Sequence, residues 1–599
     1  MDIFGILSMI GGLALFLYGM EAMGDGLSKL SGGRMERLLE KLTSKRIMAV
    51  LLGAGVTAVI QSSSATTVMV VGFVNSGIMK LNQAVGIIMG ANIGTTITSW
   101  LLSLTGIQGS SFVLKMLKPS SFSPILAIVG IIFIMFTKDE KKKDIGGIFL
   151  GFAILMYGME AMSGAVAPLA DNEKFTGILT MFSNPILGLL AGTILTAVIQ
   201  SSSASVGILQ ALCATGAVNF STALPIIMGQ NIGTCVTAII SSIGTSKNAK
   251  RAAAVHLFFN ISGTFIFMVV FYTLNTFVHF SFLNTAASPA GIAVIHSLFN
   301  IGATILLFPF ANILEKIAIL AIPDKGSEVE EMEEEKINPD LARLDERFLD
   351  KPGFAMEECR GVAINMARKS KKAMNLAIDL LKEYDEKTSA RVEKLENQID
   401  QYEDALGTYL VKLSERDLSV KDSRTLSVLL HCIGDFERIS DHAVNIRDAA
   451  VEMNKKNLQF SDKAKQELLV FSNAIRDIID RAVLAFETGD TGLAKEVEPL
   501  EQVVDALNKE EKQRHINRLR TGTCTIELGF VLSDISTNFE RAADHCSNIA
   551  VCLLQVDEGG FDTHEYLDIL KEENSEEFRH EYMELSEKYA LPESKHGGK

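Results

Sequence analysis

Long apolar runs dominate the first half of the chain and are missing from the second. Between residues 47 and 114 the one charged side chain is Lys80, and residues 175–246 contain no Lys, Arg, Asp, Glu or His. Apolar stretches of this length are typical of helices that cross a bilayer. The pattern predicts membrane spans near residues 4–23, 82–104, 122–137, 145–163, 222–244, 252–277 and 289–311.

Beyond Pro323 the pattern changes to charged residues with apolar positions three and four residues apart. This spacing predicts amphipathic helices that pack in bundles, so the expected fold class is all-α throughout. The acidic start of this half has no apolar periodicity and is expected to be a solvated linker. The expected parts of the chain are a membrane domain at 1–315, the acidic linker at 323–345, a helical domain at 350–555 and a C-terminal helical tail at 556–599.

The membrane half contains an internal repeat in which three blocks match at one offset. The blocks at residues 18–23, 57–65 and 89–95 return at 157–162, 196–204 and 228–234. Blocks that match in one register predict two copies of one unit and point to a site that the copies share. The copies are expected at about residues 4–137 and 145–311.

The positions of Lys and Arg predict opposite orientations for the two copies. Six of these residues crowd positions 29–46 after the first Tyr-Gly-Met-Glu block, whereas the loop after the second block has Lys174 alone. Because Lys and Arg near span ends stay on the cytoplasmic side, residues 24–46 are expected inside and residues 164–184 outside. Inverted repeats follow, with the helical domain in the cytoplasm. The loop at 105–121 is then expected outside, although it carries two lysines.

Each Gln-Ser-Ser-Ser block lies between two short apolar arms. In residues 47–78 each arm is about 14 residues long, shorter than the roughly 20 that a full span needs, which favours a re-entrant hairpin with the serines at its tip. Irregular backbone at membrane depth is tolerated where it lines a wet cavity. The N–H groups that start the second arm suit an anion, and carbonyl, Gln and Ser oxygens suit Na⁺. The alternative is that these hydroxyls only join helices in a bundle.

A second paired block, Asn-Ile-Gly-Thr, begins at Asn92 and at Asn231. Its glycines are expected to interrupt a span near the middle, and paired breaks in corresponding helices indicate a transport site. Close helix packing with a hydrogen-bonded Asn is the alternative. His256 and His296 begin a smaller echo, His-Leu-Phe-Phe-Asn-Ile and His-Ser-Leu-Phe-Asn-Ile, where buried, hydrogen-bonded histidines are expected and proton sensing is the alternative.

Composition excludes several other classes of protein. The net charge is -15, and no basic stripe with interleaved aromatic residues is present, so no nucleic-acid partner is expected. The seven cysteines have no Cys-x-x-Cys spacing, which argues against a disulfide framework or a zinc site. The chain has no P-loop and no evident catalytic constellation, so it is not expected to be an enzyme. Without embedded Lys or Arg, an anion site in the membrane half depends on hydroxyls, amides, N–H dipoles and co-bound cations.

The doubled membrane motifs resemble those of the type II sodium/phosphate cotransporter family over about residues 1–315. The resemblance implies sodium-coupled transport of inorganic phosphate across the plasma membrane by alternating access. Cys235 stands where the first copy has Thr96, so one hydroxyl of the family pattern is absent. By this resemblance the substrate and sodium sites are formed by Gln61, Ser62, Ser63, Ser64, Asn92, Thr95, Thr96, Gln200, Ser201, Ser202, Ser203, Asn231 and Thr234.

The helical domain has a repeat of its own, in which Glu-Arg-x-x-Asp-His-x-x-Asn-Ile starts at Glu437 and again at Glu540. On a helix the first and fifth residues of this block share a face, and clustered carboxylates on adjoining helices can bind metal ions. A solvated face of Glu–Arg pairs is the alternative. The signature resembles the PhoU family of phosphate-signalling regulators, which implies a divalent or iron-type metal. The candidate ligands are Glu437, Asp441, Glu540 and Asp544.

The expected partners are inorganic phosphate, the coupling ion Na⁺ and the lipid bilayer, and a homodimer is the candidate assembly. The expected location is the plasma membrane, in a multi-pass protein whose C-terminal domain is cytoplasmic. Two other functions stay open at this point. One is a membrane-anchored phosphate sensor without net transport, and the other is a transporter or exporter of a different small oxyanion. The family that this chain resembles also includes phosphate exporters, so the direction of transport is also open.

Overall fold

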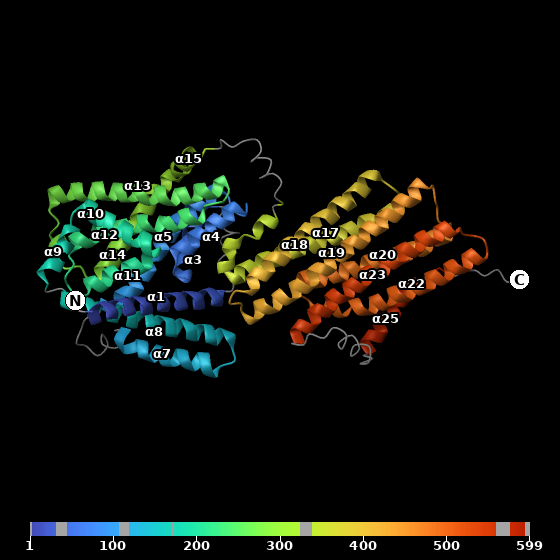
Figure 1. Ribbon diagram of the computed structural model, residues 1–599, viewed down its shortest axis with the longest axis horizontal. Helices are drawn as coiled ribbons and strands as arrows, with labels where there is room; N and C mark the ends of the chain where they lie inside the picture. The colour runs from blue at the N-terminus through green and yellow to red at the C-terminus, as the bar shows by residue number, and fades with distance from the viewer. Residues whose placement is uncertain are drawn as a thin grey trace. The chain divides into compact units, whose positions relative to one another are not determined.

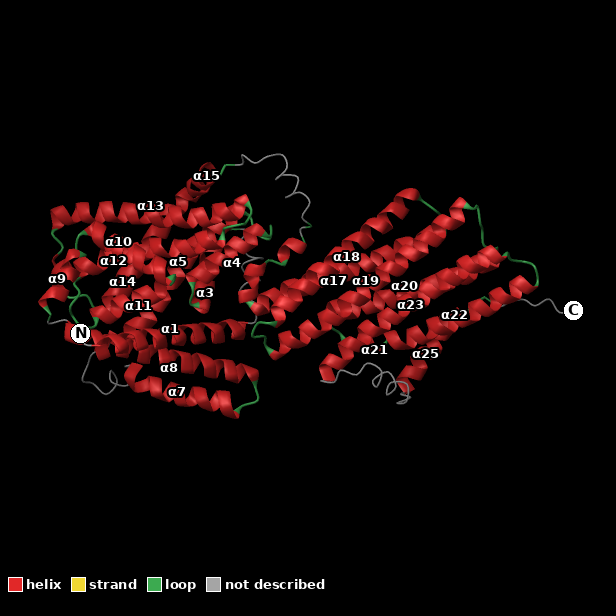
Figure 2. Ribbon diagram, viewed as in Figure 1, coloured by secondary structure: helices red, strands yellow, loops and turns green. Residues whose placement is uncertain are grey.

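The computed structural model describes residues 3–31, 45–106, 119–169, 172–323, 338, 340–558 and 576–592. This part of the chain is helical, and its extended pairing consists of an isolated antiparallel bridge between Asn219 and Ala286 (Figure 2). The predicted all-α class is confirmed. The chain separates into two compact units, Met1–Phe354 and Ala355–Lys599.

The first unit contains the helices from α1 to α15 (Figure 1). Short 3₁₀ turns join several of them, at Leu104–Gly106, Ala167–Leu169, Ser281–Asn284 and Phe308–Phe310. The α-helices are α1 (Ile3–Ser31), α3 (Arg46–Ile60), α4 (Ser63–Asn75), α5 (Leu81–Ser103), α7 (Pro119–Phe136), α8 (Glu140–Val166), α9 (Glu173–Met181), α10 (Pro185–Ile199), α11 (Ser202–Cys213), α12 (Phe220–Ser241), α13 (Lys247–Val278), α14 (Pro289–Leu307) and α15 (Ala311–Ala321).

Six helical segments among the described residues are long and apolar enough to cross a membrane: Ile3–Leu27, Leu81–Gly106, Lys141–Leu169, Phe220–Ser241, Lys247–Val278 and Pro289–Ala321. Five of them contain a predicted span, and the span predicted at 222–244 extends three residues beyond the end of Phe220–Ser241. The remaining predicted span, at 122–137, lies on the shorter apolar helix Ser121–Phe136. Large apolar side chains on α1, such as Phe4 and Leu7, are exposed, as expected for surfaces that face lipid.

Helices α1 and α8 carry the matched Tyr-Gly-Met-Glu blocks and pack closely against each other. A Cβ atom placed on Gly12 would meet Gly158, one on Gly19 would meet Gly151, and one on Gly26 would meet the Asp144 carbonyl. Residue numbers rise along one helix while they fall along the other, so the two helices are antiparallel. Equivalent helices that run in opposite directions are what inverted repeats require.

The arms of the two hairpins pack on the helices that carry the Asn-Ile-Gly-Thr blocks. A Cβ atom on Gly90 of α5 would lie 2.0 Å from the Val50 carbonyl oxygen of α3. At the equivalent place in the second copy, a Cβ atom on Gly229 of α12 would lie 2.0 Å from the Leu189 carbonyl oxygen of α10. Only glycine allows backbones this close, so both copies use it for helix packing.

Residues 340–354 fold back onto the first unit. The Phe348 ring is 1% exposed and lies against Gly72 and Phe73 of α4, with its centroid 5.5 Å from that of Phe73. Asn75 Nδ2 donates to Asp345 Oδ2 at 2.9 Å. The segment therefore packs against the end of one arm of the first hairpin. Residues 324–337 and 339, most of the expected acidic linker, lie outside the described residues.

The second unit is a bundle of long helices that lie side by side (Figure 1). Its core includes edge-to-face pairs between Phe436 and Phe486 and between Phe471 and Phe539. Serine and aspartate side chains cap several helix starts, for example Ser461, whose hydroxyl accepts from Ala464 N. The helices are α17 (Pro352–Leu380), α18 (Glu386–Ser414), α19 (Val420–Lys455), α20 (Asp462–Thr488), α21 (Thr491–Lys495), α22 (Val497–Arg520), α23 (Ile526–Glu558) and α25 (Glu576–Lys588).

Candidate functional site

The first Gln-Ser-Ser-Ser block forms a tight turn between α3 and α4. Gln61 ends α3 in the left-handed region, at φ 61°, and its N–H donates to the Thr57 carbonyl at 2.8 Å. The Ser62 hydroxyl then caps α4 by accepting from Ala65 N at 3.1 Å. The chain thus turns back after an arm of 15 residues and starts another of 13. This geometry is that of the predicted re-entrant hairpin.

The second block forms the same turn between α10 and α11. Gln200 has φ 59°, and Ser201 accepts from Ala204 N at 3.2 Å. A hydroxyl pair also joins the arms in each copy. Thr57 Oγ1 donates to Thr66 Oγ1 at 3.0 Å, and Thr196 Oγ1 donates to Ser205 Oγ at 2.8 Å.

The two tips meet. The hydroxyl oxygens of Ser63 and Ser202, which are equivalent residues, lie 3.5 Å apart, and both residues are buried. Ser64 Oγ also donates to the Gln200 carbonyl at 3.4 Å. The N-termini of α4 and α11 therefore converge with their free N–H groups and their positive dipole ends. The structure brings together the residues that the sequence placed at two separate tips.

The Asn-Ile-Gly-Thr blocks do not interrupt their helices. Helix α5 continues through residues 90–96, and α12 continues through residues 229–235, so the predicted helix breaks are wrong. The glycines instead allow close packing, since a Cβ atom on Gly94 would lie 2.5 Å from the Ala54 carbonyl oxygen. The alternative prediction, close helix packing with a hydrogen-bonded Asn, describes these helices correctly.

Each asparagine of these blocks pairs with a second asparagine. Asn92 Nδ2 donates to Asn260 Oδ1 at 2.8 Å, and Asn231 Nδ2 donates to Asn300 Oδ1 at 2.7 Å. Asn260 and Asn300 stand at matching places in the His-x-x-x-Asn echo on α13 and α14. Sequence reasoning singled out the histidines of this echo and missed its asparagines, although their repetition was visible.

The histidines of the echo differ from expectation. His256 and His296 are buried as predicted, but their ring nitrogens have no hydrogen-bond partner among the described residues, so the expectation of hydrogen-bonded rings is wrong. Their backbone carbonyls accept bonds instead. Asn260 Nδ2 donates to the His256 carbonyl at 3.1 Å, and Asn300 Nδ2 donates to the His296 carbonyl at 2.9 Å.

The hydroxyls that follow the asparagines bond within their own helices. Thr95 Oγ1 donates to the Ala91 carbonyl at 3.1 Å, and Thr96 Oγ1 donates to the Ile93 carbonyl at 2.7 Å. In the second copy Thr234 Oγ1 donates to the Gln230 carbonyl at 2.9 Å, and the Cys235 thiol approaches the Asn231 carbonyl at 3.5 Å. Each oxygen keeps its lone pairs, so a cation remains an available partner.

In the second unit the candidate metal ligands form two pairs. Burial, with repulsion from Asp441, raises the pKa of Glu437 to about 7, and Arg438 lies 3.8 Å from Asp441. Burial, with repulsion from Glu540, raises the pKa of Asp544 to about 6. Among the described residues, no group of three or more His, Cys, Asp or Glu is arranged to hold a metal ion.

The histidines and asparagines of the PhoU-like signature link the two helical repeats. His442 Nδ1 lies 2.8 Å from Asn538 Oδ1, and His545 Nδ1 lies 2.8 Å from Asp435 Oδ1. The two imidazole rings stack with centroids 5.6 Å apart. The rings therefore mark a contact between α19 and α23, in which equivalent residues of the two repeats face one another.

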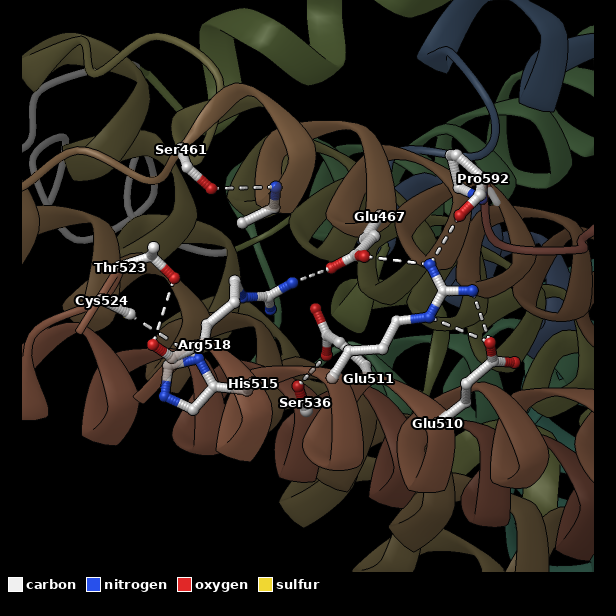
Figure 3. A network of polar contacts seen from close by, with 12 residues as sticks. Ser461, Glu467, Glu510, Glu511, His515, Arg518, Thr523, Cys524, Ser536 and Pro592 are labelled. Atoms are coloured by element: carbon white, nitrogen blue, oxygen red, sulfur yellow. Dashed lines mark hydrogen bonds and ion pairs between the residues drawn. The ribbon is translucent and has the colours of Figure 1, made fainter. Parts of the chain in front are cut away.

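A buried polar network on α20, α22 and α23 had no sequence signal, because its members are far apart in the chain (Figure 3). Glu467 accepts from Arg514 Nη1 at 3.0 Å and from Arg518 Nη1. The Ser536 hydroxyl donates to Glu511, which is 1% exposed. Burial raises the pKa of Glu511 to about 7, and the neighbouring Glu467 adds to this shift.

Antiparallel equivalent helices, two re-entrant hairpins and tips that meet define a polytopic inverted-repeat membrane transporter. Comparison with known proteins identifies the family more closely. The Na⁺/Pi-cotransporter family model matches residues 15–164 and 154–287, and the PhoU domain model matches residues 363–450 and 468–553. By these matches the first unit contains a Na⁺/Pi-cotransporter domain, and the second unit carries PhoU domains.

Individual relatives cover one or both units. The "Putative inorganic phosphate export protein YjbB" of Salmonella typhimurium is 24% identical over 526 residues, which is 86% of this chain and 91% of the relative. The sodium-dependent phosphate transport protein 2A of Rattus norvegicus is 39% identical over 113 residues, 18% of this chain and 17% of the relative. The crystal structure of PhoU from Pseudomonas aeruginosa aligns with a TM-score of 0.33 at 22% identity, over 34% of this chain and 97% of that chain.

Proposed function

We propose that this protein moves inorganic phosphate across the membrane, coupled to sodium, and that the two serine tips hold the substrate and the ion. The meeting of Ser63 with Ser202 carries the proposal, because it joins the N-termini of α4 and α11 at one place. Helix N-termini suit an oxyanion. The chain between residues 175 and 246 has no Lys or Arg, so the charge of phosphate requires co-bound cations.

The asparagine and threonine positions complete the proposed site. Asn92, Thr95, Thr96, Asn231 and Thr234 offer amide and hydroxyl oxygens, which are ligands that a hard cation accepts. Related proteins support both substrate and ion, since one is named for phosphate export and another for sodium-dependent phosphate transport. The first name states export and the second states no direction, and a flux assay reads the direction directly.

The test is phosphate flux in proteoliposomes with an imposed sodium gradient. Flux that follows the sodium gradient and is abolished by Gln61→Ala and by Gln200→Ala supports the proposal, because each change removes a polar ligand from a tip. Ser241→Ala is the matched control, since its hydroxyl donates to the Ala238 carbonyl of its own helix, at 2.9 Å. Near-normal flux in both glutamine variants would show that the tips are not part of the site.

The same assay separates the rival functions. Phosphate binding without flux, in either direction, identifies a membrane-anchored sensor. Stronger competition by unlabelled sulfate or a carboxylate than by phosphate identifies a transporter of another oxyanion. Comparison of phosphate flux under an inward and under an outward sodium gradient gives the direction of coupling.

We further propose that the second unit is cytoplasmic and regulates transport in response to phosphate or metal. Glu437, Asp441, Glu540 and Asp544 are the proposed metal ligands. The raised pKa values of Glu437 and Asp544 support this, since crowded, partly buried carboxylates are stabilised by a bound cation. The match of this unit to the PhoU domain model supports the regulatory role.

Metal content of the purified chain tests the ligand assignment. Glu437→Gln combined with Asp441→Asn is expected to lower the bound metal, because hard cations require ionised oxygens. The control is Glu386→Gln with Asp462→Asn, two exposed acids outside the signature. Equal metal in the double variant and the wild type would exclude these ligands.

A further inference from the structure

The two hairpin tips have the same backbone but different side-chain environments. Gln61 and Gln200 are equivalent, both are left-handed, and both N–H groups bond the threonine four residues earlier. The Gln61 side chain is nevertheless 5% exposed, whereas Gln200 is exposed. The equivalent glutamines of the two copies therefore have different surroundings.

A hydrogen bond accompanies the buried glutamine and is absent at the exposed one. Thr98 Oγ1 of α5 donates to Gln61 Oε1 at 2.9 Å. Its equivalent on α12 is Thr237, whose hydroxyl oxygen is buried without a hydrogen-bond partner in the described part of the chain. A buried hydroxyl without a partner costs free energy, so its natural partner is missing in this conformation.

The contacts that α1 and α8 make beside the two hairpins also differ. On α1, a Cβ atom at Gly24 would lie 3.1 Å from the Ile60 carbonyl oxygen, beside the first tip. The equivalent residue on α8 is Ser163, which donates to the Ala211 carbonyl of α11 at 3.3 Å instead. Val198, two residues before Gln200, is 76% exposed. The glutamine end of the first tip is therefore covered, and that of the second tip is exposed.

Two copies of one unit in different conformations are what alternating access uses. In inverted repeats, exchange of the two conformations produces the state that opens to the other side of the membrane. In that state Gln200 would be buried and Gln61 exposed. Thr237 would then have the partner that it lacks here.

We propose that Thr98–Gln61 and Thr237–Gln200 are alternating latches, of which one is formed in each of the two facing states of the transporter. The proposal rests on the proposed transport function and adds two positioning residues, Thr98 and Thr237, that act through the glutamines. Loss of one latch destabilises one state only, so it shifts the population toward the other.

The experiment is hydrogen–deuterium exchange of the full chain in lipid nanodiscs, read on peptides that cover residues 57–65 and 196–204. Thr98→Val removes the hydroxyl with little change of shape. It is expected to raise exchange at the first tip and to lower it at the second. The ratio of exchange at the first tip to exchange at the second should change by roughly fivefold, which corresponds to the loss of one buried hydrogen bond. Thr237→Val is expected to change the ratio in the opposite direction, and the double variant to restore it.

Two control variants separate the latch from packing. Thr98→Ser keeps the hydroxyl and is expected to keep the wild-type ratio. Thr276→Val alters an exposed threonine on α13 whose hydroxyl bonds the Thr273 carbonyl of its own helix, and is expected to leave both tips unchanged. Exchange that rises only at the substituted copy, or a double variant that adds both effects, overturns the proposal.

The outcome is independent of the flux assay. Reciprocal changes in exchange without phosphate flux would support the latches and contradict the proposed function. Normal phosphate flux without reciprocal changes in exchange would support the proposed function and contradict the latches.

Discussion

Glu511 is a carboxyl group with almost no exposed surface, on α22 of the second unit. Its side chain is 1% exposed, and the Ser536 hydroxyl donates to one of its oxygens. The other oxygen has no hydrogen-bond partner among the described residues. Burial raises the pKa of this group from 4.5 to about 7, so the folded state favours the neutral acid.

The sign of the resulting pH dependence follows from this shift. The folded chain holds a proton that the unfolded chain releases between pH 4.5 and about 7. This contribution to the free energy of unfolding is therefore complete below pH 4.5 and is lost as pH rises through about 7. Glu511→Gln removes the dependence, because an amide stays neutral.

We expect Glu511→Gln to gain stability over the wild type as pH rises from 5 to 8, by up to about 3 kcal/mol. Denaturant unfolding of residues 355–599 at several pH values measures the difference. Glu386→Gln, an exposed position on α18, is the control and is expected to follow the wild type. Parallel curves for Glu511→Gln and the wild type would show that this carboxyl group does not titrate in that range.

At the scale of elements, the hairpin arms depend on glycines of the Asn-Ile-Gly-Thr helices. Gly90 lets α5 approach α3 so closely that a Cβ atom would lie 2.0 Å from the Val50 carbonyl oxygen. Gly55, on α3 itself, has no atom within 4 Å of the corresponding position. The same substitution at these two glycines therefore separates packing from helix propensity.

We expect Gly90→Ala to push α3 away from α5 and to destabilise the first unit by about 1–3 kcal/mol, the usual cost of overpacking. Gly55→Ala is expected to be neutral or slightly stabilising, because alanine is the better helix former. Thermal unfolding of the purified chain in detergent compares the two variants. Equal unfolding temperatures would mean that the helices separate without cost.

At the scale of the whole molecule, the membrane unit contains both copies of its proposed site. Every residue proposed to bind phosphate or sodium lies before residue 235. Residues 340–354 also belong to this unit, where Phe348 and Phe354 pack with Phe73 of α4. All of the proposed phosphate and sodium ligands therefore belong to the first unit.

We expect deletion of residues 355–599 to leave phosphate flux measurable but to remove its control by phosphate or metal. Deletion of residues 324–599 also removes the aromatic packing on α4, and is expected to lower the thermal stability of the membrane unit further. Flux in proteoliposomes and unfolding temperature distinguish the two truncations. Complete loss of flux in both would make the second unit part of the transport machinery.

Much of this architecture was predictable because repetition and hydrophobic pattern are local properties of the chain. The two Gln-Ser-Ser-Ser blocks, each between arms too short to cross a bilayer, predicted the hairpins that Gln61 and Gln200 form. The opposite loop charges predicted the inversion that the antiparallel packing of α1 and α8 requires. The ligand roles of the candidate residues stay predictions.

Tertiary structure alone decided which polar groups meet. Glycine near Asn92 is compatible with both a helix break and close packing, and only the approach of α3 selects the continuous helix. The pairing of Asn92 with Asn260 joins residues far apart in the chain, so no local pattern predicts it. Two near-identical motifs also give no sequence signal that their environments differ. Gln61 is buried and Gln200 is exposed because the helix packing around the two copies differs.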